Sequence, residues 1–114
     1  MTPIIKVVHP TGILDSTKSH QFRQEICELL NDEVDAIIID FKDVTFMDSS
    51  GLGALVISLK NVRSAGAKLF ICSVNEQIKM LFELTSMDRV FKIFSSKEEL
   101  EKIILHGSPS DLEP

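Results

Sequence analysis

The run Ala36-Ile37-Ile38-Ile39-Asp40 constrains the fold of this 114-residue chain more than any other segment. Its apolar residues are consecutive rather than alternating, which suits a strand covered on both faces, as in a parallel sheet with helices on each side. Three further apolar segments of strand length lie at Ile4–Val8, Lys68–Cys72 and Val90–Phe94. We therefore expect a mixed, mostly parallel sheet of about four strands.

Segments with helical periodicity alternate with these strands. The first begins at a cap among Asp15, Ser16 and Thr17 and runs to about Asn31. The next predicted helices are Gly51–Ser64, followed by a stop at Gly66 with positive φ, then Glu76–Thr85, and last a helix capped by Ser95 or Ser96 that ends at Gly107. Residues 41–46 are expected to run along the edge of the sheet. The pattern predicts one α/β domain over residues 1–107 with about four helices, and a disordered tail over residues 108–114.

The composition narrows the classes of function. A net charge of -5 makes nucleic acid and anionic lipid poor partners, and favours a basic patch on another protein. Cys27 and Cys72 form no CxxC pair or Cys/His cluster, so we expect no metal site and two reduced, largely buried thiols. No segment resembles a signal peptide or a membrane span, so a cytoplasmic location is expected. The sequence leaves the oligomeric state open, and a monomer is the default expectation.

The stretch Phe46-Met47-Asp48-Ser49-Ser50-Gly51-Leu52-Gly53 is the most unusual part of the sequence. It follows a predicted strand and opens a predicted helix, where partner sites of α/β sheets lie and where free N–H groups favour anions. Asp48, Ser49 and Ser50 are all good N-cap residues, while the two glycines cost the helix about 1 kcal/mol each relative to alanine. The stretch is therefore either a helix cap alone or a site that something approaches closely.

Known phosphate and nucleophile motifs do not fit this stretch. No lysine follows the glycines as in a P-loop, the GxGxxG spacing fails, and GxSxG lacks its first glycine. His9, His20 and His106 show no pattern that marks a base for a catalytic serine, and we expect them to be solvated surface residues. A phosphoserine at Ser49 requires no such base, and a helix N-terminus tolerates its charge.

The same stretch resembles the signature of the STAS family, and in particular the stand-alone bacterial anti-sigma factor antagonists. Further similarity lies at residues 11–15, 40–44, 66–69 and 81–84, so the resemblance covers about residues 4–105. Relatives often carry a further strand before Ile4–Val8, and often a glutamate where this chain has Ile13.

The resemblance implies that Ser49 is phosphorylated by an anti-sigma factor that is an ATP-binding serine kinase. The unphosphorylated antagonist would bind that kinase and free a sigma factor, phosphorylation would end the binding, and a metal-dependent serine phosphatase would restore it. ATP and metal would belong to these partners, so this chain would need no cofactor and would not be an enzyme. The expected partner-binding residues are Asp15, Asp48, Ser49, Ser50, Gly51, Gly53 and, on the exposed side of the helix, Lys60.

Two other readings stay open. The chain could be a STAS subunit or scaffold of a transporter or signalling assembly, in which the serine is structural. It could also be an enzyme with Ser49 as nucleophile, although no base accompanies that serine in the sequence.

Overall fold

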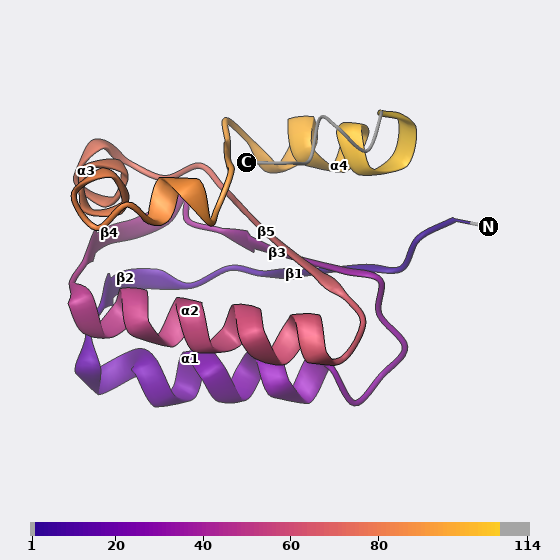
Figure 1. Cartoon of the computed structure of the whole chain (residues 1–114), viewed down its shortest axis with the longest axis horizontal. Coiled ribbons are helices and arrows are strands. Elements are labelled where there is room, and N and C mark those ends of the chain that lie inside the picture. The colour runs from indigo at the N-terminus through magenta and orange to yellow at the C-terminus, as the bar shows by residue number, and fades with distance from the viewer. Residues whose placement is uncertain (1, 108–114) are drawn as a thin grey trace.

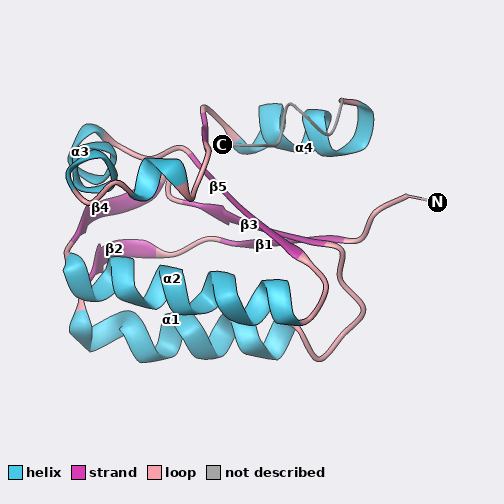
Figure 2. Ribbon diagram, in the orientation of Figure 1, coloured by secondary structure: helices cyan, strands magenta, loops and turns pink. Residues whose placement is uncertain are grey.

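The computed structural model describes residues 2–107, which form an α/β domain with helices on both faces of a parallel sheet (Figures 1 and 2). The predicted tail, residues 108–114, lies outside the described residues. The elements in chain order are β1 (Ile5–Val8), β2 (Thr11–Leu14), α1 (Ser16–Leu29), β3 (Ala36–Asp40), β4 (Asp43–Met47), α2 (Ser49–Ser64), β5 (Lys68–Cys72), α3 (Glu76–Leu84), a 3₁₀ turn η1 (Met87–Arg89), β6 (Ile93–Phe94) and α4 (Lys97–His106).

The main sheet confirms the expected four strands, in the order β1-β3-β5-β6, and each neighbouring pair is parallel. All five residues of β3 are buried, as the uninterrupted apolar run predicts. Ile37 and Ile39 join the core beneath α1 and α2, whereas Ile38 packs on the opposite face, in the cluster that contains Leu100 of α4. Figure 1 shows α1 and α2 side by side on one face of the sheet and α4 on the other.

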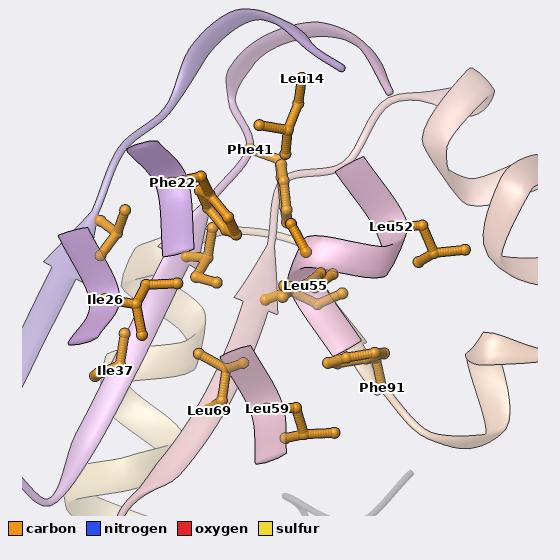
Figure 3. Packing of buried hydrophobic residues seen from close by; sticks show 14 of the residues in the cluster. Leu14, Phe22, Ile26, Ile37, Phe41, Leu52, Leu55, Leu59, Leu69 and Phe91 are labelled. Atoms are coloured by element: carbon orange, nitrogen blue, oxygen red, sulfur yellow. The ribbon is translucent and has the colours of Figure 1, made fainter. Parts of the chain in front are cut away.

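The larger core lies between the sheet and the pair α1 and α2, and Figure 3 shows its packing. Phe22 and Ile26 of α1 and Leu55 of α2 are buried against Ile37 and Leu69 from the strands. Burying side chains of this size contributes roughly 1.5–3 kcal/mol each, so the core fixes both helices on the sheet.

A second, two-stranded parallel sheet pairs β2 with β4, and this differs from the expectation that residues 41–46 only follow the sheet edge. In β4, Val44 and Met47 are buried while Asp43, Thr45 and Phe46 are exposed. Such a polar and irregular pattern gives a weak strand signal, because half-buried strands normally alternate strictly.

The structure differs from the sequence-based predictions in the bounds of β6 and α1 and in the exposure of Cys27. The last strand is Ile93–Phe94 rather than Val90–Phe94, because η1 occupies the preceding segment and the Phe91 N–H donates to the Met87 carbonyl at 2.9 Å. α1 ends at Leu29 rather than near Asn31, and Cys27 on α1 is exposed, in contrast to buried Cys72.

Two turn predictions are confirmed. Gly66 adopts φ +81° directly after α2. Ser96 caps α4, where its hydroxyl accepts a hydrogen bond from the Glu99 N–H at 3.1 Å.

Candidate functional site: the paired starts of α1 and α2

The parallel pairing of β2 with β4 places the starts of α1 and α2 next to each other. Leu14 and Met47 are register partners at the ends of the two strands, and the Asp48 N–H donates to the Leu14 carbonyl at 3.4 Å. Asp15 and Asp48 follow these residues directly. Two of the predicted site residues, which are far apart in the sequence, therefore lie at one end of the molecule.

Both aspartates are helix N-caps. Asp15 Oδ1 accepts hydrogen bonds from the Thr17 N–H at 3.0 Å and from the Thr17 hydroxyl at 2.5 Å. Asp48 Oδ1 accepts from the N–H groups of Ser50 at 2.9 Å and Gly51 at 3.1 Å. The hydrogen bonds from the Thr17 hydroxyl and N–H lower the pKa of the Asp15 carboxyl, because they stabilise its charged form.

The Asp48 cap also moves the start of α2. The helix begins at Ser49, two residues before the predicted start at Gly51, because the cap places the serine in the first turn. Ser49 is exposed, and its hydroxyl forms no hydrogen bond with another residue in the described range. The phosphorylation candidate is thus a free hydroxyl at a helix N-terminus.

Ser19 connects the two helix starts. Its hydroxyl donates to the Asp15 carbonyl at 2.7 Å and lies 3.3 Å from the carbonyl of Ser50. Ser50 is exposed. Its backbone N–H takes part in the cap of α2, and its carbonyl takes part in the link to α1. Ser19 was not predicted as a site residue, because nothing in the sequence relates it to Ser50, 31 positions away.

The two glycines of the signature have different surroundings. A Cβ atom at Gly51 would lie 2.3 Å from the Leu14 carbonyl oxygen and 2.9 Å from Met47 Cγ, whereas a Cβ atom at Gly53 would meet nothing within 4 Å. Gly51 is buried, and its missing side chain makes room for β2, an internal requirement that the sequence-based interpretation did not include. Gly53 has no such internal requirement.

Two amide side chains from the start of α3 form hydrogen bonds with the backbone of β4, which pairs with β2 as its neighbouring strand. The Gln77 amide accepts from the Met47 N–H at 2.9 Å and donates to the Met47 carbonyl at 2.8 Å, much as a neighbouring strand would. Asn75 caps α3 by accepting from the Ile78 N–H at 2.9 Å, and its amide nitrogen lies 3.1 Å from the Thr45 carbonyl. Both residues were missed as site residues, although Asn75 directly before a predicted helix is a recognisable cap signal.

Lys60 lies apart from these residues. It is exposed on α2, on the same side of the helix as Gly53, because seven residues make about two turns. Its distance from Ser49 along the helix axis is about 16 Å, from a rise of about 1.5 Å per residue. The structure therefore places Lys60 on the same helix surface as the signature but outside the cluster at the helix starts.

The histidines are exposed, as predicted, but one of them has a partner. His9 Nε2 lies 2.8 Å from Asp43 Oδ2, which joins the end of β1 to the start of β4. His20 lies on α1, along a shallow groove that Ser50 also lines. No group of three or more His, Cys, Asp or Glu side chains within residues 2–107 is arranged to hold a metal ion. Each helix in the same range is too short or too polar to cross a membrane.

Comparison with known proteins gives one consistent family. The family model for the STAS domain matches residues 2–100. A homologue of an anti-sigma factor antagonist from Thermotoga neapolitana is 31% identical over 101 residues, which cover 87% of this chain and 89% of that protein.

Solved structures agree with the sequence comparison. The crystal structure of an anti-sigma factor antagonist from Thermotoga maritima superposes with a TM-score of 0.80 at 27% identity, covering 91% of this chain and 92% of that chain. The fold also matches the anti-sigma factor antagonist SpoIIAA in its unphosphorylated form, with a TM-score of 0.77 at 21% identity and coverage of 91% and 90%. The phosphorylated form of SpoIIAA from Bacillus matches with a TM-score of 0.67 at 20% identity, covering 90% of this chain and 94% of that chain.

Proposed function

The chain belongs to the STAS domain family, and we propose that it is an anti-sigma factor antagonist whose partner binding is switched off by phosphorylation of Ser49. In its unphosphorylated form it binds an anti-sigma factor that is also a serine kinase, and so frees a sigma factor. A metal-dependent serine phosphatase removes the phosphate and resets the switch. The chain itself acts in the cytoplasm as a monomer, without catalytic activity or a cofactor of its own.

The observation that carries the proposal is the free Ser49 hydroxyl beside an engaged aspartate. Asp48 uses its carboxylate to accept the Ser50 and Gly51 N–H groups, so the cap does not depend on the serine side chain. The Ser49 hydroxyl is exposed at the first position of α2 and forms no hydrogen bond with the described residues. A kinase can therefore modify this hydroxyl without breaking an interaction that the fold needs.

The same position determines what a phosphate would do. Phosphorylation adds a charge of about -1.5 to -2, which the positive end of the α2 dipole stabilises and the nearby Asp48 carboxylate opposes. These effects on stability have opposite signs, so we expect the fold to persist. The surface at the helix starts changes sharply in charge, which is the change that a partner can detect.

SpoIIAA supports this proposal, since that structural neighbour is described in both an unphosphorylated and a phosphorylated form. The partner-contact surface would consist of Asp15, Asp48, Ser49, Ser50 and Gly53, with Lys60 farther along α2. Gly51 contributes indirectly by allowing α2 to begin against β2.

The first experiment is peptide mass spectrometry of the protein purified from its native cells across growth and stress conditions. We expect a phosphate on Ser49 in part of the population. Ser64→Ala is the matched control, because it removes an exposed hydroxyl at the other end of α2 and should leave the phosphate in place, whereas Ser49→Ala should abolish it. Complete absence of phosphate under all conditions would refute the switch and favour a structural serine, as in a transporter or scaffold subunit.

The second experiment measures binding to the kinase that modifies Ser49. Ser49→Ala should bind constitutively, and Ser49→Asp should bind at least about tenfold more weakly, because a carboxylate reproduces part of the phosphate charge. The two variants alter the same atom position, so each serves as the control for the other. Equal affinity of both variants would contradict the proposed control by charge.

A further inference from the structure

A shallow groove between α1 and α2 begins at the proposed switch and continues away from it. Its lining includes Ser19, His20 and Arg23 from α1 and Ser50, Gly53 and Ile57 from α2. Ser50 directly follows Ser49, and Gly53 lies one helical turn farther along α2. The groove is therefore continuous with the surface on which phosphorylation acts.

The α2 side of the groove is apolar and open. A Cβ atom at Gly53 would meet nothing within 4 Å, so the glycine leaves space that the fold does not use. Ile57 follows one turn later and is 42% exposed, while Ala54 between them is buried and closes the floor. This space suits an apolar side chain from another protein.

The charge of the groove is opposite to that of the chain. The ionisable residues along it are His20 and Arg23, and no carboxylate belongs to its lining. α2 carries Lys60 and Arg63 and no acidic residue. The chain as a whole has a net charge of -5, so its carboxylates lie elsewhere on the surface.

Neither Arg23 nor His20 forms an ion pair with another described residue. Asp15 and Asp48, which lie near the groove at the helix starts, are already engaged by backbone N–H groups at the helix caps. Glu25 is two residues from Arg23 in the sequence, but it lines other hollows. Arg23 therefore presents a guanidinium that is available to a carboxylate of another protein, and such pairs are commonly bidentate.

We propose that the α1–α2 groove binds an acidic segment of the anti-sigma factor, with an apolar side chain between Gly53 and Ile57 and a carboxylate on Arg23. This inference rests on the proposed function and adds to it the chemistry that the partner must present. It also differs from the expectation based on net charge, which favours a basic partner surface.

The groove gives phosphorylation a direct electrostatic effect. Ser49 is four residues before Gly53, which corresponds to about 6 Å along the helix axis. That separation is shorter than the Debye length of about 10 Å at 0.1 M salt, so a phosphate on Ser49 repels an acidic segment in the groove. Loss of partner binding then requires no change in the fold.

The test uses the purified kinase that phosphorylates Ser49 and compares three variants of the full chain. Arg23→Glu should weaken binding by at least about tenfold, and Gly53→Gln should do the same by filling the groove. Lys102→Glu is the control, because it makes the same charge change on an exposed residue of α4, on the opposite face of the sheet, and should change the affinity less than about twofold. Gly53→Gln has room for its Cβ and gains helix propensity, so it separates loss of binding from loss of folding.

The identity of the partner segment is tested by charge reversal on the kinase. One of its Asp→Arg or Glu→Arg variants should restore binding to Arg23→Glu, and the affinity of wild-type chain should fall as salt concentration rises. The inference is refuted if Ser49→Asp weakens binding while Arg23→Glu and Gly53→Gln bind like wild type. If no kinase acts on Ser49, or Ser49→Asp leaves binding unchanged, the proposed function fails instead.

Discussion

The two signature glycines should respond to alanine with opposite signs. At Gly51 a new Cβ would lie 2.3 Å from a backbone carbonyl oxygen of Leu14 and 2.9 Å from Met47 Cγ. Overpacking costs about 1–3 kcal/mol, and we take the upper part of that range, about 2–3 kcal/mol, because the carbonyl is backbone and accepts from the Asp48 N–H. The gain in helix propensity, about 1 kcal/mol, offsets only part of that cost. Gly51→Ala should therefore destabilise the domain by about 1–2 kcal/mol.

Gly53→Ala is the matched variant on the same helix. Its Cβ meets nothing within 4 Å, so the propensity gain remains and the stability should rise by up to about 1 kcal/mol. For a domain of this size, 1 kcal/mol shifts Tm by about 4 °C, which thermal and denaturant unfolding followed by circular dichroism resolve. Equal Tm values for Gly51→Ala and wild type, or an equal loss of stability in Gly53→Ala and Gly51→Ala, would contradict the different surroundings of the two glycines.

Three further predictions test the frame around the site. Gln77→Ala removes both hydrogen bonds to the buried backbone of Met47, so unfolding free energy should fall by about 2 kcal/mol, and unchanged denaturation would contradict this. A thiol reagent at pH 8 should label one cysteine per native chain and two after denaturation, because Cys27 is exposed while burial raises the pKa of Cys72 to about 11; rapid native labelling of both would be inconsistent. The Asp15 pKa is lowered in the fold, so its stabilisation is present above the unfolded pKa of about 3.9 and is lost as pH falls through the folded value. The stability of Asp15→Asn should therefore lack the loss at low pH that comes from protonation of Asp15. If stability depends on pH identically in Asp15→Asn and wild type, the Asp15 cap does not contribute as proposed.

The sequence predicts the parts of the fold in which one segment alone carries the signal. β3 is recognisable because every residue from Ala36 to Asp40 is buried, and the apolar run shows this directly. β4 cannot be recognised in this way, because it pairs with β2, about 30 residues away in the sequence, and because its Phe46 is exposed. Val90 fails as a strand residue for a related reason, since η1 competes for the same segment.

In the candidate site, too, the sequence predicts local features but not those that depend on how distant segments pack. Asp48 and Ser49 are found from the sequence because cap chemistry is local. Gln77 cannot be found in this way, because its amide acts as a substitute strand neighbour only after α3 packs beside β4. The different roles of Gly51 and Gly53 also depend on which side of α2 faces β2, and the sequence alone shows only that two glycines are close together.

The surroundings of Ser49 would allow the proposed phosphorylation to act without a conformational change. β4 is held by β2 on one edge and by the Gln77 amide on the other, so Asp48 follows a strand whose backbone groups are satisfied at its end. The Ser19 hydroxyl of α1 forms a hydrogen bond with the Ser50 carbonyl at the start of α2, and both helices pack against the sheet through the hydrophobic core. We therefore expect Ser49 to keep its position on this frame when its hydroxyl carries a phosphate. Under the proposed function, control of binding would then come from the charge that the surface presents, and the groove next to Ser49, with Arg23 and His20 in its lining, would determine the partner chemistry that the switch can regulate.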